Sequence, residues 1–167
     1  MRNALLFFGL AISLGVPGFA VVQKERQLAN GTQMLVELAP VDPRSLIQGD
    51  YMRLDYAMAR QVGRPTDWPR DGHLVVRLDS QGVARFVRRH SEAVPISTGE
   101  HLLQYRRRGQ RIRIGTDAFF FQEGHAARYS GARYGELRVD AAGGSVLVGL
   151  RDSELRRLGA VPDLKIH

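Results

Sequence analysis

The residues best suited to chemistry lie between Pro40 and Tyr56, in the stretch PVDPRSLIQGDYMRLDY. Carboxylates, guanidinium groups and a phenol follow one another there, and such groups recognise polar ligands or transfer protons. The pairs Asp42-Pro43 and Gly49-Asp50 are also typical of tight turns, and neighbouring carboxylates and arginines often pair with each other. The binding hypothesis is that one contact surface lies on an edge of the fold, formed by Asp42, Arg44, Asp50, Tyr51 and Arg53. Asp55 is considered with these residues.

A second concentration of charge lies in two predicted hairpins. Arginines end the strand at residues 83–90, and five more surround the turn at residues 108–110: Arg106, Arg107, Arg108, Arg111 and Arg113. After that turn arginines alternate with Ile112 and Ile114, which is the pattern of a half-buried strand with a basic outer face. Either this face is solvated and paired with carboxylates, or it binds the phosphates of a lipid or a polymer.

The sequence gives little support to nucleophilic or metal-dependent catalysis. Cys is absent, which excludes disulfides, Cys-ligated zinc, iron–sulfur clusters and a cysteine nucleophile. The only lysines, Lys24 and Lys165, lie too near the ends to serve as the base of a Ser–Lys pair with Ser45. The five histidines lack metal-ligand spacing, so no metal or cofactor is expected. The remaining enzyme hypothesis uses the carboxylates of Asp50 and Asp117 with arginines as electrophiles.

Residues 4–22 form a run of 19 positions without a charge, ALLFFGLAISLGVPGFAVV. A membrane-spanning helix needs about 20 apolar residues, so this run predicts a membrane anchor over residues 1–29. A signal peptide cleaved near Ala20 and a buried helix are the alternatives. Asn30-Gly31 is a helix stop. The flanking charges favour an N-terminus in the cytoplasm and residues 23–167 outside it.

The chain has 167 residues and a net charge of +7, and 24 of its residues are basic. This length accommodates one domain with an appendage. The basic excess points to an anionic partner, such as lipid headgroups or an acidic protein surface. Nucleic acid is not expected, because a domain outside the cytoplasm rarely meets it.

Residues 30–167 read as short strands joined by turns. Strands are predicted at 32–39, 50–59, 73–79, 83–90, 101–107, 111–114, 136–140 and 145–151. Residues 122–130 predict one short helix, and 118–121 predict either a strand or the entry to a helix. Successive hairpins without alternating helices predict a mainly β fold, with an antiparallel sandwich or a partly closed barrel.

Residues 49–56 spell GDYxxLxY, and further stretches in a fixed order accompany them: PVDPRSLIQ, GTDAFFFQEG, YGELRVD and LVGLRD. From about Gly31 to Asp152 the chain resembles the GDYXXLXY family of membrane-anchored bacterial proteins. The resemblance implies an N-terminal anchor in the inner membrane, a β-rich domain beyond it and a multi-pass membrane protein as partner. It implies no established activity and no catalytic residues. The named motif positions are Gly49, Asp50, Tyr51, Leu54 and Tyr56.

These observations predict a membrane-anchored accessory, binding or scaffolding protein of the bacterial envelope. The lipid bilayer is its expected partner through residues 4–22. An envelope enzyme that uses carboxylates of the GDY region, and a module that binds anionic lipid, are the alternatives. The family motif leaves Tyr51 as the position free to face outward. One of the three phenylalanines Phe119, Phe120 and Phe121 is expected to be exposed unless the segment is buried on both sides.

Overall fold

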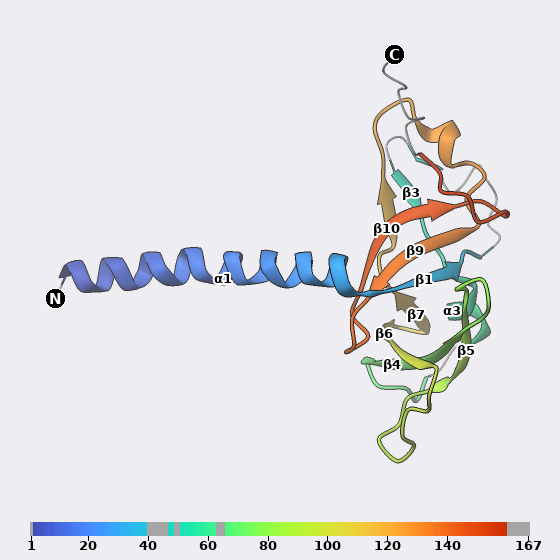
Figure 1. Ribbon diagram of the computed structural model, residues 1–167, viewed down its shortest axis with the longest axis horizontal. Helices are drawn as coiled ribbons and strands as arrows, with labels where there is room; N and C mark the ends of the chain where they lie inside the picture. Colours follow the sequence, from blue (N-terminus) through green and yellow to red (C-terminus); the bar gives the residue numbers. More distant parts are fainter. Residues whose placement is uncertain (1, 40–46, 49–50, 63–65, 160–167) are drawn as a thin grey trace.

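The structure, a computed structural model, describes residues 2–39, 47–48, 51–62 and 66–159; for residues 2–12, 14, 16, 26, 47 and 48 it describes the backbone alone. A long N-terminal helix, α1 (Arg2–Asn30), leads away from a β-rich domain formed by the rest of the described chain (Figure 1). Ten strands and two short helical segments follow α1 within the described residues.

The helix α1 ends where the sequence predicts a stop, at Asn30-Gly31. The N–H of Gly31 donates to the carbonyl oxygen of Gln27 at 2.9 Å. A Cβ built on Gly31 would lie 2.4 Å from that same oxygen, so only glycine fits this exit from the helix. Because the first sheet strand begins at Thr32, helix and domain are joined without a flexible linker.

Polar contacts fix the end of α1 to the β domain. The side chain of Gln27 is buried, and its Nε2 donates to the carbonyl oxygen of Gly144 at 2.6 Å. Its Oε1 accepts a hydrogen bond from Lys24 Nζ at 3.0 Å. Arg138 donates to the carbonyl oxygen of Gly31 at 3.1 Å. These contacts set the direction in which α1 leaves the domain.

The described apolar side chains of α1 do not pack on the domain. Phe19 is 73% exposed, Val21 56% and Val22 45%, so a helix buried in the domain is the wrong interpretation for these residues. The side chains of residues 4–12, which begin the predicted apolar run, lie outside the described ones. In the part of the chain whose placement is described, no helix has the length and apolarity needed to cross a membrane.

The strands form three antiparallel sheets, which confirms the mainly β prediction. One sheet has the order β1 (Thr32–Glu37), β9 (Tyr134–Val139) and β10 (Ser145–Arg151). A small sheet joins β2 (Ile47–Gln48), β3 (Tyr51–Arg53) and β8 (Ala118–Phe120). The third has the order β5 (Ala84–Arg89), β4 (Asp71–Leu78), β6 (Glu100–Arg108) and β7 (Arg111–Ile114).

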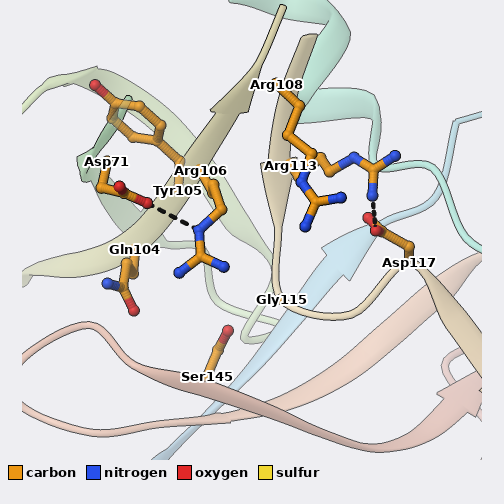
Figure 2. A pocket seen from close by; sticks show the side chains of 9 residues that line it. All are labelled: Asp71, Gln104, Tyr105, Arg106, Arg108, Arg113, Gly115, Asp117 and Ser145. Carbon is orange, nitrogen blue, oxygen red and sulfur yellow. Dashed lines mark hydrogen bonds and ion pairs between the residues drawn. The ribbon is translucent and has the colours of Figure 1, made fainter. Parts of the chain in front are cut away.

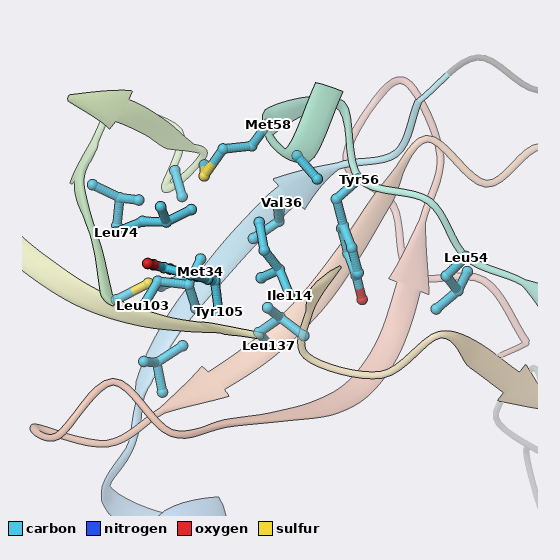
Figure 3. Close-up of a cluster of buried hydrophobic side chains, with 14 of the residues drawn as sticks. Met34, Val36, Leu54, Tyr56, Met58, Leu74, Leu103, Tyr105, Ile114 and Leu137 are labelled. Atoms are coloured by element: carbon cyan, nitrogen blue, oxygen red, sulfur yellow. The ribbon is translucent and has the colours of Figure 1, made fainter. Parts of the chain in front are cut away.

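The three sheets enclose one apolar core as a half-barrel, the partly closed of the two predicted arrangements. A bridge between Leu35 and Val83 links the first sheet to the third, and one between Leu38 and Tyr56 links the first to the segment after β3. Figure 3 shows that core side chains from β1 and β9 of the first sheet meet those from β4, β6 and β7 of the third, with Leu54 and Tyr56 beside them. Among the buried members are Met34, Val36, Met52, Tyr56, Leu74, Leu103, Tyr105, Ile114 and Leu137.

Two predicted elements differ from those observed. The strand predicted at residues 50–59 ends at Arg53, and a short helix, α3 (Ala57–Gln61), follows. Residues AMARQ are good helix formers, and the helix still buries Met58 in the same core as the strand residue Met52. The helix predicted at residues 122–130 is only a 3₁₀ turn, η1 (Ala126–Tyr129), because Gly124 adopts a φ of +80° before it.

Replacing Gly72 with alanine should destabilise the domain. A Cβ at this position would lie 2.8–2.9 Å from the hydroxyl oxygen and two ring carbons of Tyr105, a core residue that is 1% exposed. Overpacking of this kind costs about 1–3 kcal/mol, and denaturant unfolding of the full-length chain measures it. The matched control is Gly131→Ala, because nothing lies within 4 Å of the added methyl group there. Equal stabilities of the two variants would show that the Tyr105 ring yields freely.

The charge of Asp79 should stabilise the domain in a pH-dependent way. Its Oδ1 accepts hydrogen bonds from the N–H groups of Val83 and Gln81, both at 3.0 Å, and Arg85 donates to Oδ2 at 3.1 Å. The bond from Val83, supported by the other two, lowers the pKa of Asp79 in the folded state.

A carboxylate whose pKa is lowered by folding contributes stability above its unfolded pKa, about 4, and loses that contribution as pH falls through the folded value. Asp79→Asn should therefore lower the melting temperature at neutral pH, and its difference from the wild type should shrink below about pH 4. Melting curves recorded over descending pH measure this, and a difference that is independent of pH would contradict the role of the charge.

Candidate functional site

The described residues of the GDYxxLxY stretch lie where the sheets meet. Tyr51 begins β3, and both Leu54 and Tyr56 are buried, as predicted. The N–H of Leu54 donates to the carbonyl oxygen of Asp117 at 2.8 Å, which ties the segment after β3 to the start of β8. The second half of the motif is therefore a structural element that joins distant parts of the chain.

The ring of Tyr56 fills a niche that two glycines leave open. A Cβ on Gly135 would lie 3.2 Å from Tyr56 Cε1, and one on Gly115 would lie 3.7 Å from its hydroxyl. That hydroxyl is buried and has no hydrogen-bond partner among the described residues. Burial, and secondarily the negative charge of Asp117, raise the pKa of Tyr56 well above its ordinary value, so this phenol is neutral in the folded protein.

The structure describes only part of the contact surface predicted from sequence. Asp42, Arg44 and Asp50 lie outside the described residues. Tyr51 and Arg53 flank the buried Met52 on β3, so both lie on the outer face of that strand. Asp55, considered with them, forms an ion pair with Arg60 at 2.8 Å.

Phe120 joins Tyr51 on this outer face. The two residues are register partners on β8 and β3, and their ring centroids lie 5.8 Å apart. Phe120 is 74% exposed, whereas Phe119 and Phe121 both pack against Tyr129. Of the two outcomes expected for these three phenylalanines, the one with an exposed ring is correct. We define Tyr51, Arg53 and Phe120 as the aromatic surface.

A polar pocket of about 200 Å³ lies between the β6–β7 hairpin and the start of β10 (Figure 2). The side chains of Gln104, Arg106 and Ser145 point toward one another across it. Its lining residues are Asp71, Gln104, Tyr105, Arg106, Arg108, Arg113, Gly115, Asp117 and Ser145. We call this hollow the arginine pocket.

The register of β6 and β7 places like charges opposite each other. Arg106 pairs with Arg113 and Arg108 with Arg111, while the positions between them carry Ile112 on the buried face. The predicted basic outer face is thus confirmed. Arginines directly opposite each other on antiparallel strands repel, so this hairpin carries an electrostatic cost that a nearby anion relieves.

Carboxylates relieve only part of this repulsion. Asp71 accepts a hydrogen bond from Arg106 Nε at 2.9 Å, and Asp117 forms an ion pair with Arg113. Among the described residues, Arg108 has no carboxylate partner. The pocket therefore has three guanidinium groups and two carboxylates, which favours an anionic ligand.

The enzyme hypothesis from the sequence names two carboxylates, Asp50 and Asp117, and one of them lies at this pocket. Asp117 lines the pocket, whereas Asp50 lies outside the described residues. Both pocket carboxylates are bound by arginines, which suits recognition better than proton transfer. No group of three His, Asp or Glu side chains that could hold a metal ion is found in the described part of the chain.

Several pocket residues escaped the sequence analysis, among them Gln104, Gly115 and Ser145. The turn predicted at residues 108–110 determines which residues of the two hairpin strands face each other. The pairing of Arg106 with Arg113 could therefore be predicted from sequence. Asp71 and Ser145 could not be found in this way. Asp71 reaches the pocket through the pairing of β4 with β6, and Ser145 belongs to a different sheet.

The comparisons with known proteins give one match. The sequence pattern of the GDYXXLXY protein family matches residues 13–150, which covers most of the chain. No curated protein and no solved structure matches it significantly. The match begins within α1 and includes the motif around Tyr56 and the β6–β7 hairpin of the arginine pocket. This chain belongs to the GDYXXLXY protein family.

Proposed function

We propose that this protein is an accessory binding subunit of the bacterial inner membrane, anchored by α1, with its β domain outside the cytoplasm. The observation that carries the proposal is the uncharged run of the sequence, whose described side chains Phe19, Val21 and Val22 are exposed. The 19 uncharged residues from position 4 to 22 lie within α1, and a helix of that length rises about 28 Å, close to the thickness of a bilayer's hydrocarbon core.

The attachment of α1 to the domain supports an anchor with a fixed orientation. Gln27, just beyond the charged residues Lys24 and Glu25, is hydrogen-bonded to Gly144 in the β9–β10 turn. A domain held this way by its anchor would keep one side near the headgroups. That arrangement suits a subunit that presents a surface to another membrane protein.

The aromatic surface supports a protein partner. An exposed phenylalanine beside a tyrosine and an arginine has the composition of an interface centre, where aromatic residues and arginine are enriched. We propose that the partner is an integral membrane protein, because the anchor confines encounters to the membrane. The enzyme hypothesis that uses the carboxylates of Asp50 and Asp117 has less support, since Asp117 is ion-paired with Arg113.

The anchor should keep the full-length protein in the membrane. In membranes from its own host, the wild type should show its full-length mass and resist carbonate extraction. Leu10→Arg with Leu14→Arg should release it or prevent insertion, because each charge at a helix centre costs about 2.5–3.5 kcal/mol of insertion free energy.

The matched control is Leu10→Ile with Leu14→Ile, which keeps the segment apolar and should stay in the membrane. If the wild-type protein is in the soluble fraction and has the mass of a chain that begins near Val21, the segment is a cleaved signal. That result would overturn the proposed anchor.

Loss of the exposed ring should weaken capture of the partner. Phe120→Ser should lower the recovery of cross-linked integral membrane proteins from native membranes by about tenfold, since interface aromatics often contribute 2 kcal/mol or more. Val87→Ser is the control, because Val87 is another exposed apolar residue, on β5 away from the aromatic surface. Equal recovery with both variants, or no membrane protein recovered by the wild type, would refute this role.

A further inference from the structure

The arginine pocket lies close to the point where α1 joins the domain. The β9–β10 turn contacts α1 through Gly144, whose carbonyl oxygen accepts from Gln27, and the next residue, Ser145, lines the pocket. The same turn is hydrogen-bonded to β6, because the N–H of Gln104 donates to the carbonyl oxygen of Gly143 at 2.8 Å. One short turn therefore connects the proposed anchor to the pocket wall.

The donors in the pocket match the oxygens of a phosphate group. Guanidinium groups bind phosphate through paired N–H donors, and Arg108 has no carboxylate partner among the described residues. Gln104 and Ser145 add an amide and a hydroxyl directed into the same space (Figure 2). An anion placed there would also screen the repulsion between Arg106 and Arg113, which stand opposite each other.

The floor of the pocket lacks a side chain at Gly115. A Cβ there would stand 3.4 Å from Ser145 Oγ and 3.7 Å from the Tyr56 hydroxyl, which has no partner among the described residues. The φ of +58° at this position also disfavours any other residue. Gly115 thus keeps the pocket lining beside Ser145 free of a side chain, and the Ser145 hydroxyl can donate to an oxyanion in the pocket. The Tyr56 hydroxyl lies buried behind Gly115 and is not part of the lining.

We infer that the arginine pocket binds the phosphate group of an anionic membrane lipid at the base of the anchor. The identification of a lipid as the source rests on the proposed function, because α1 would hold the pocket near the headgroups. Free inorganic phosphate carries the same oxygens and is the other source of this chemistry. The pocket would fix how the domain sits on the membrane, leaving the aromatic surface to the partner.

The test titrates the full-length chain in neutral dodecylmaltoside micelles with three probes: phosphatidylglycerol, phosphatidylcholine and sodium phosphate. Microscale thermophoresis gives the apparent dissociation constants. Phosphatidylglycerol should bind more tightly than the other two probes, and added salt should weaken it. Arg108→Gln alone, and with Arg113→Gln, should weaken it by about tenfold or more, as expected when charge-assisted hydrogen bonds are lost.

The control double variant is Arg128→Gln with Arg133→Gln. It removes the same charge from exposed positions at and beyond η1, far from β6 and β7 (Figure 1). Equal weakening by both double variants would reduce the effect to overall charge and overturn the site. Equal binding of phosphatidylglycerol and phosphatidylcholine by the wild type would also overturn the site.

Two further results separate the inference from the proposed anchor. If sodium phosphate binds as tightly as phosphatidylglycerol and is lost in Arg108→Gln, the lipid source is wrong and free phosphate is the ligand. If carbonate releases the wild-type protein, the anchor fails, yet the phosphate arm still tests the pocket because it requires no membrane. Thermal unfolding of each variant confirms that the fold is retained.

Discussion

The fold depends on the burial of one aromatic ring, that of Tyr56. It occupies the junction of the three sheets, where Gly115 and Gly135 leave room for it and the bridge to Leu38 ties its backbone to the chain after β1. These contacts come from residues 18 to 79 positions from Tyr56 in the sequence, and all of them lie within the residues that match the family's pattern. Stretches distant in the chain thus form the sides of one niche.

The niche has a cost, since the Tyr56 hydroxyl is buried without a hydrogen bond in the described structure. An unsatisfied buried hydroxyl costs about 1–3 kcal/mol, which a phenylalanine would avoid. Gly115 belongs both to this niche and to the lining of the arginine pocket, so the core around Tyr56 and the pocket share that glycine.

Charge organises the outer surface as apolar packing organises the core. The β6–β7 hairpin is held by Ile112, Ile114 and Tyr105 on its buried face, and this packing forces its arginines into opposed pairs on the other face. Asp71 and Asp117 reduce the repulsion without cancelling it. Gln27 places this basic surface beside the end of α1. A basic pocket at the base of an apolar helix is the arrangement that a membrane surface with anionic lipids would favour.

The sequence by itself determined the local features of this protein: the helix stop at Asn30-Gly31, the hairpin turns, the burial of Leu54 and Tyr56, and the basic outer face at residues 111–114. Each depends on neighbours within a few positions, where periodicity and turn chemistry are sufficient. It did not determine that the strand after Tyr51 ends at Arg53, because alternating apolar residues fit both a strand and the α3 turn that buries Met58. Only the tertiary structure brought Asp71, Gly115 and Ser145 to one pocket and Phe120 beside Tyr51, because pairing between distant strands sets those positions.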